Sequence, residues 1–129
     1  MNTDIIIQLF EKEITSGETV EIKEALDKDY KYLVGIAIAD GVCSDSAIIE
    51  IAKIKGLEFL PSDFEAVNII ATKNVNPNKR FFTLFNMVKI NGDDLVIHFI
   101  DSAFADSYNL KIQVLLTNNP EGIKDALNN

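Results

Sequence analysis

Short apolar runs rich in isoleucine, valine and phenylalanine recur along the chain, and turn residues separate them. In "YKYLVGIAIADG" the side chains alternate in direction, which predicts Tyr30, Val34 and Ile38 on one face of a strand and Leu33 and Ala37 on the other. Similar period-two runs span Ala47–Ile54, Phe81–Ile90, Leu95–Ile100 and Leu110–Leu116. Repeated short strands of this kind are typical of a β-sandwich or barrel.

Further β-rich segments begin at Asp4, Val20 and Leu57, so the chain carries about eight predicted strands. Eight strands with connections of unequal length fit a two-sheet sandwich. We therefore expect an all-β, antiparallel fold of the single jelly-roll type. The tight turn "NGDD" predicts that the strand before it, Phe81–Ile90, pairs as a β-hairpin with the strand after it, Leu95–Asp101.

Two segments predict short helices. Ser62 and Glu65 have the spacing of a capping box, which predicts a helical turn near residues 62–66 that runs into a strand over "VNIIAT". At the end of the chain, a proline suited to the first helical position precedes Ile123 and Leu127, which lie four residues apart on one face. This pattern predicts a short C-terminal helix.

A length of 129 residues suits one domain, residues 1–129, with a core large enough to fold without disulfides. Cys43 is the single cysteine, so it cannot form a disulfide within the chain. The longest apolar run, Leu33–Ala39, is far shorter than the roughly 20 residues that span a bilayer. No basic segment precedes the first apolar residues, as a secretion signal would require. We expect a protein without a membrane span that is made in the cytoplasm.

The formal net charge is −8, which argues against a nucleic-acid partner, because phosphate binding needs clustered lysine and arginine. Lys79 and Arg80 form the only dense basic pair. Acidic residues are concentrated in the first thirty positions. This acidic segment is expected to be a solvated edge or a surface that meets a basic partner.

The stretch "NGDDLVIHFIDSAFADS" holds the only histidine, His98, together with several aspartates. On a strand, Asp94 lies on the same face as His98 but about 13 Å away, and Asp101 points to the opposite face. A metal or acid–base site needs at least two groups that converge, and this spacing supplies only a single group. Pairing Cys43 with His98 as nucleophile and base has no supporting local signature. We expect no catalytic residue, metal site, cofactor or small-molecule substrate.

One alternative site stays open. Asp40 and Asp45 in "DGVCSDS" place oxygen ligands in one loop, so weak calcium binding is an alternative there, although the spacing of an EF-hand is absent.

The segment "LDKDYKYLVGIAIADG", Leu26–Gly41, resembles a pattern in small structural proteins of tailless, icosahedral bacteriophages. An acidic turn leads there to a tyrosine and then to a strand with a central glycine. The segments "PSDFEAVNI" and "NKRFF" also fit the pattern. The resemblance implies a β-sandwich or jelly-roll capsid component and a location in the virion, and it carries over no functional residues.

We therefore expect a non-enzymatic assembly protein that associates with itself or with other capsid subunits. The alternative is a β-sandwich binding module for a carbohydrate, peptide or protein, although the absence of tryptophan counts against sugar binding. The predicted interface consists of apolar residues in loops and in the tail, together with the basic pair. Each apolar residue could instead fold back on its own domain. Its members are Val42, Cys43, Val75, Pro77, Lys79, Arg80, Phe104, Ile123 and Leu127.

Overall fold

A computed structural model describes residues 5–38, 43–44, 46–61, 63–66, 82–103 and 106–121, with the backbone alone for residues 82–86. The described residues form antiparallel strands, which confirms the all-β prediction. The strands are β1 (Ile5–Ile14), β2 (Val20–Ala25), β3 (Tyr32–Ile38), β4 (Ile48–Ile54), β5 (Leu57–Glu58), β6 (Phe64–Glu65), β7 (Phe82–Lys89), β8 (Asp94–Ile100) and β9 (Tyr108–Thr117).

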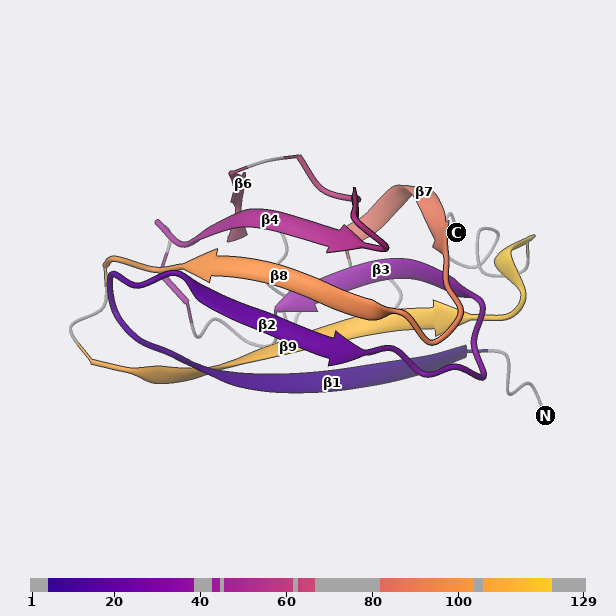
Figure 1. The fold of residues 1–129 in the computed structure, drawn as a ribbon, viewed down its shortest axis with the longest axis horizontal. Helices are drawn as coiled ribbons and strands as arrows, with labels where there is room; N and C mark the ends of the chain where they lie inside the picture. The colour runs from indigo at the N-terminus through magenta and orange to yellow at the C-terminus, as the bar shows by residue number, and fades with distance from the viewer. Residues whose placement is uncertain are drawn as a thin grey trace, which may run out of the picture.

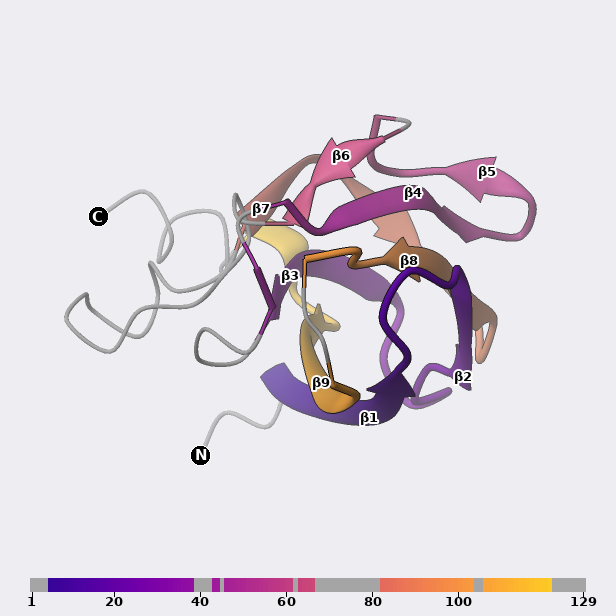
Figure 2. The same ribbon diagram turned by 90° about the vertical axis from the view of Figure 1, so that its left-hand side faces the viewer.

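The strands form two sheets that pack against each other (Figures 1 and 2). Sheet A has the order β1-β9-β3-β7, and sheet B has the order β2-β8-β4-β5, with β6 also beside β4. Figure 2 shows the two layers, with β4 and β5 above β1 and β9. From β1 to β4, and again from β7 to β9, each strand is followed by a strand of the other sheet.

The predicted hairpin between the strands that flank "NGDD" is wrong. β7 pairs with β3 in sheet A, whereas β8 pairs with β2 and β4 in sheet B. The turn is a corner between the sheets: the Ile90 N–H donates to the Lys31 carbonyl, and the Leu26 N–H donates to the Asp93 carbonyl. Gly92 adopts a φ of 69°, a conformation that favours glycine. A tight turn therefore fixes a reversal of the chain without fixing which sheet receives the next strand.

The predicted helical turn near residues 62–66 is also wrong. Phe64 and Glu65 form β6, which pairs with Ile49 and Ile48 of β4. The Ala66 N–H donates to the Ala47 carbonyl across the same pair of strands. Bonding to a neighbouring strand outweighs the local capping signal here, because the fully buried Ala66 belongs to the core. The predicted strand after residue 66 and the predicted C-terminal helix over Ile123 and Leu127 lie outside the described residues.

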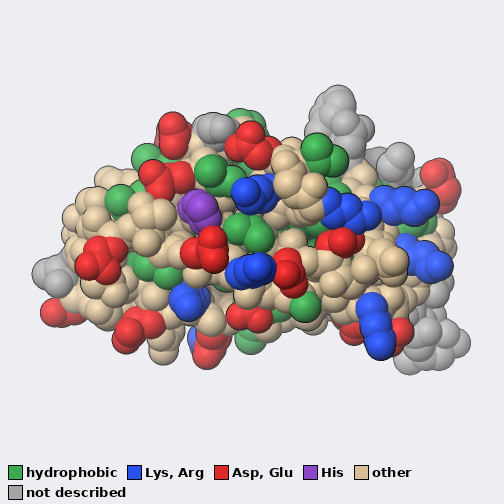
Figure 3. All heavy atoms as spheres, in the orientation of Figure 1, with side chains coloured by type: hydrophobic (Ala, Val, Ile, Leu, Met, Phe, Trp, Pro, Cys, Tyr) green, Lys and Arg blue, Asp and Glu red, His purple; other side chains and the backbone are tan. Residues whose placement is uncertain are grey.

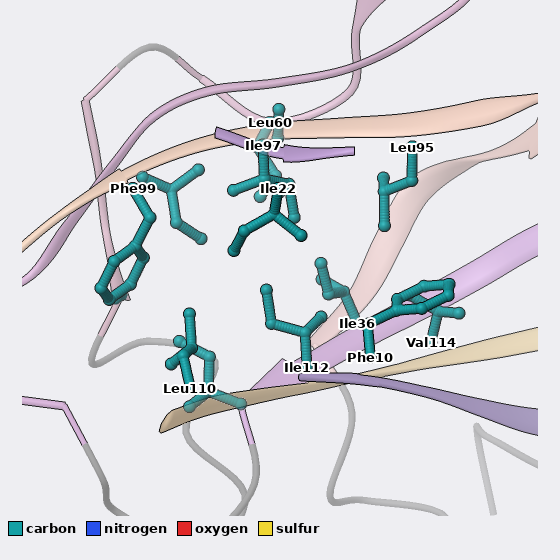
Figure 4. Packing of buried hydrophobic residues seen from close by; sticks show 14 of the residues in the cluster. Phe10, Ile22, Ile36, Leu60, Leu95, Ile97, Phe99, Leu110, Ile112 and Val114 are labelled. Atoms are coloured by element: carbon teal, nitrogen blue, oxygen red, sulfur yellow. The ribbon is translucent and has the colours of Figure 1, made fainter. Parts of the chain in front are cut away.

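The core lies between the two sheets and is built from the inward row of each strand. Figure 4 shows Leu95, Ile97 and Phe99 of β8 facing residues from sheet A across this space. The period-two pattern read from the sequence places these three residues on one face, as observed. The fully buried side chains of largest volume are Phe99, Ile14, Ile22, Leu33, Ile36, Ile38, Ile49, Ile54, Ile90, Leu95 and Ile97.

A β-bulge in β3 changes the predicted faces of that strand. The register against β7 and β9 shifts between Leu33 and Gly35. Leu33 therefore joins Ile36 in the main core, whereas Val34 packs with Leu115 in a separate small cluster. Leu115 lies between two core residues of β9, so this second cluster is on the outer face of sheet A. The prediction that put Val34 on the face of Ile38 is wrong, because the extra residue of a bulge reverses the alternation.

The inward row of β8 yields a stability prediction. We expect Ile97→Ala to lower the free energy of unfolding by about 2–5 kcal/mol, because it leaves a cavity in a fully buried site. The neighbour Val96 points to the other face and is partly exposed, so Val96→Ala should cost at most about 1 kcal/mol. Urea unfolding of the two variants measures this difference, and equal losses would contradict the assigned faces.

Candidate functional site

The structure separates the acidic residues that surround His98 in the sequence. His98 lies on the outer face of sheet B, and its Nε2 is 3.1 Å from Glu21 Oε2, directly across from it on β2. Asp94 Oδ2 lies 3.9 Å from Lys23 Nζ, and Asp93 Oδ2 lies 3.4 Å from Lys55 Nζ. Asp106 is exposed. Asp93 and Asp94 therefore each meet a lysine, and neither converges on His98.

This face of the molecule carries mixed charge. Figure 3 shows the histidine among acidic and basic side chains that alternate over the surface. Within the part of the chain that the structure describes, no group of three or more histidine, cysteine, aspartate or glutamate residues is placed to hold a metal ion. The described part of this face is therefore a solvated surface of paired charges.

The most constrained polar group is the carboxylate of Asp101, immediately after β8. Asp101 is fully buried. Its Oδ1 accepts the Ser44 hydroxyl at 2.6 Å and the Ala103 N–H at 3.1 Å. Its Oδ2 accepts the Tyr108 hydroxyl at 2.7 Å and the Ser44 N–H at 2.9 Å. The Asp101 carbonyl also accepts the Gly17 N–H at 3.1 Å. The residue thus joins three separate connections at one end of the sheets.

Hydrogen bonding sets the protonation state of this cluster. Burial alone would raise the pKa of Asp101, but bonds from the side chain and N–H of Ser44, from Tyr108 and from Ala103 outweigh it. The pKa of Asp101 therefore lies below its ordinary value of 3.8. Burial, together with the hydrogen bond to Asp101 and the charge of that carboxylate, raises the pKa of the Tyr108 hydroxyl, so it stays a donor. An ionised carboxylate with four donors and no exposure has a structural role.

The strand pattern in the sequence places Asp101 on the face opposite His98, but it does not indicate the hydrogen-bond partners of Asp101. The bond from the Ala103 N–H two residues later is the local motif of an aspartate-led turn, and "DSA" is a signal for it. Ser44 is more distant along the chain, so only the fold brings it to Asp101. The corner could be predicted as a turn, while its role as a junction could not.

Of the predicted interface, the structure describes Cys43 alone. Its thiol side chain is only 6% exposed and belongs to the main core cluster, so it packs into its own chain. The other predicted members lie outside the described residues, as do the loop aspartates Asp40 and Asp45 considered for calcium. That interface stays a prediction.

An exposed apolar surface lies on β1, on the strand face that the sequence pattern predicts for Ile5, Ile7 and Leu9 without predicting their exposure. Ile5, Ile7 and Leu9 alternate on the outer face of sheet A and are 39%, 55% and 52% exposed. We call these three side chains the β1 stripe. Ile7 lies opposite Leu115, so the stripe borders the second apolar cluster. The signal was present in "IIIQLF", where Ile5, Ile7 and Leu9 share one face, Ile6 and Phe10 share the other, and only one face can face the core.

Comparisons with known proteins identify no relative: no family model, no curated protein and no solved structure matches the chain. Among the described residues, no helix is both long and apolar enough to cross a membrane.

The buried carboxylate yields a prediction about mutation and pH. Asp101→Asn should lower the free energy of unfolding by about 2–4 kcal/mol at neutral pH, because the amide nitrogen would face donors where the carboxylate oxygen accepts. Since the pKa of Asp101 is lowered by folding, its contribution is complete above about pH 4 and is lost as the pH falls through the folded-state pKa. The stability difference between wild type and variant should therefore shrink below pH 4 in urea titrations. A difference that is constant with pH would argue against an ionised Asp101.

The exposed pair on sheet B yields a second prediction. His98→Ala should lower the free energy of unfolding by less than about 1 kcal/mol, because a polar side-chain contact that is open to solvent contributes little. It should also leave any assembly of the protein unchanged. Glu21→Ala, which removes the other partner, serves as the matched variant in thermal unfolding and size measurements. A loss of several kcal/mol on His98→Ala alone would reveal an unrecognised role for the ring.

Proposed function

We propose that the chain is a single jelly-roll subunit that assembles into a larger particle, and that it is a capsid component of a bacteriophage virion. The observation that carries the proposal is the nested pairing of strands. β1 pairs with β9, β2 with β8, β3 with β7, and β4 with β5 and β6. This is the order obtained when one long antiparallel hairpin is rolled into two sheets. Jelly rolls of this kind occur in viral capsids, lectins and cupins.

The residues available for chemistry favour the capsid among these three classes. A cupin-type enzyme builds its metal centre from several histidines, and the single histidine here is paired with Glu21 on an outer face. The proposed subunit is therefore not an enzyme and uses no cofactor. A fold does not determine function, so the surface must support the choice. The β1 stripe is an apolar surface of the kind that marks contact with other proteins.

In this proposal the subunit is made in the host cytoplasm and then packs against further copies of itself or other capsid subunits. The predicted contact of the acidic first thirty residues with Lys79 and Arg80 of a neighbour belongs to the same proposal, since opposite charges fix the register of an interface. Nucleic acid is not a proposed partner, because the net charge of −8 repels phosphate.

The test is the oligomeric state of the purified protein. Sedimentation velocity and negative-stain images should show a symmetric oligomer, because closed symmetry is usual when copies associate through interfaces of about 1,000 Å² or more. Lys79→Glu combined with Arg80→Glu, and added salt, should weaken the assembly. A protein that stays monomeric at its highest soluble concentration would contradict the proposal. Binding to a glycan or peptide library by such a monomer would favour the binding module for a carbohydrate, peptide or protein ligand.

A further inference from the structure

We propose that the first half of β1, Ile5–Leu9, pairs antiparallel with the same segment of a second copy of this chain, about a twofold axis at Ile7. The inference deepens the proposed assembly function and rests on it. It names an interface that differs from the loops and tail predicted from the sequence. The evidence is the combination of an open sheet edge, an exposed apolar pattern and the positions of the neighbouring charges.

β1 is an edge strand of sheet A and runs along the lower margin of the molecule in Figures 1 and 2. Among the described residues it pairs with β9 alone, over its full length Ile5–Ile14. Within the described part of the chain, one edge of its backbone therefore presents N–H and C=O groups to another strand. Such an edge is a template for strand addition unless charge, proline, a bulge or a short length protects it.

The first half of β1 has none of these protections. The edge strands of sheet B do have them, and β7, the other edge of sheet A, has an irregular register against β3. The edge strand β2 of sheet B is six residues long and carries Glu21, Lys23 and Glu24. β5 and β6 have two residues each. The second half of β1 carries Glu11, Lys12 and Glu13. Ile5–Leu9 is free of charge and of proline, and its register against β9 is unbroken.

The inner face of this segment is anchored, which keeps the β1 stripe pointing outward. The Gln8 amide donates to the Ala25 carbonyl at 3.2 Å, and its Oε1 accepts the Asp27 N–H at 3.0 Å. These bonds tie β1 to the connection that follows β2 in the opposite sheet. A one-residue slip, which would turn the stripe inward, would break both bonds. The edge therefore presents one defined pattern to a partner.

That pattern is complementary to itself about Ile7. In antiparallel pairing with this centre, Ile7 lies opposite Ile7 of the second copy, and Ile5 lies opposite Leu9 of the second copy. All outward pairs are then apolar, and the two stripes form a continuous surface across an extended sheet. Pairs of aliphatic side chains directly opposite each other stabilise an antiparallel ladder. A closed twofold contact of this kind also prevents further strand addition at the same edge.

The charges of β1 exclude the competing registers. With the axis at Leu9, Glu11 of one copy would lie opposite Ile7 of the other. With the axis at Lys12, lysine would face lysine and Glu11 would face Glu13, and like charges directly opposite are destabilising. With the axis at Ile7, the two Glu11 side chains are separated by eight residues of strand, about 27 Å. This distance exceeds the Debye length of about 8 Å at physiological salt, so their repulsion is screened.

Charge placed on the axis tests the interface. Ile7→Lys should weaken self-association by at least about 100-fold in sedimentation velocity, because it sets two lysines against each other at the centre of the contact. Leu57→Lys is the matched control: Leu57 is 72% exposed on the opposite sheet and lies outside the contact. It should leave association unchanged. Circular dichroism should show folded protein for both variants, since both positions are solvent-accessible.

Cross-linking tests the register. Opposite residues in an antiparallel pair have Cα atoms about 4.5–5.5 Å apart, within the range of a disulfide. Ile7→Cys should therefore form a disulfide-linked dimer under mild oxidation. Leu9→Cys alone should not, because the two substituted positions would be about 14 Å apart. A mixture of Ile5→Cys and Leu9→Cys proteins should link to each other. Wild type, whose only cysteine, Cys43, is buried, should not link.

The outcomes separate this interface from the proposed function. A wild-type oligomer that persists in Ile7→Lys, or cross-linking of Ile7→Cys no better than that of Leu9→Cys, would overturn the β1 pairing and leave the assembly function standing. A wild-type protein that is monomeric throughout would overturn both. Loss of association in Ile7→Lys alone, with the expected cross-linking pattern, would establish the second copy as the partner of β1.

Discussion

The packing of the two inward apolar rows against each other is the constraint on which the rest of the structure depends. Each strand has one apolar row that must be removed from water, and a single sheet cannot bury it. The chain meets this requirement by sending most consecutive strands to opposite sheets, so that the inward rows of the two sheets cover each other across the core. Connections that would be hairpins in a flat sheet therefore become corners.

Where the chain crosses between the sheets, backbone N–H and C=O groups have no neighbouring strand to bond with. Leaving such groups unpaired would cost free energy, and polar side chains offset this cost. At one end, buried Asp101 collects donors from Ser44, Ala103 and Tyr108. At the other end of β9, the Asn118 side chain accepts the Lys31 N–H and donates to the Asp29 carbonyl. Both residues bridge segments far apart in sequence. The apolar rows thus hold the layers together, and these polar junctions fix how the ends close.

The sequence predicted what depends on neighbouring residues. Alternation in Leu95–Ile100 identified the buried face of β8, and the count of strands pointed to two sheets. Contacts between residues far apart in the sequence could not be predicted. Examples are the pairing partner of β7, the strand pairing of Phe64 and the hydrogen bond from Ser44 to Asp101. The bulge between Leu33 and Gly35 shows the limit within a single strand, since one extra residue reverses the faces that a regular alternation assigns.

The same architecture explains why the proposed contact between copies lies at a sheet edge. Two open sheets necessarily leave edge strands, and only closure into a barrel removes them. On β2 the exposed edge is short and charged, and the end of β1 carries Glu11, Lys12 and Glu13. A net charge of −8 repels copies that approach at random. Against this background, the uncharged run at Ile5–Leu9 permits close approach in the register that we propose. In that proposal, an edge that is a hazard in an isolated sheet becomes a selective contact.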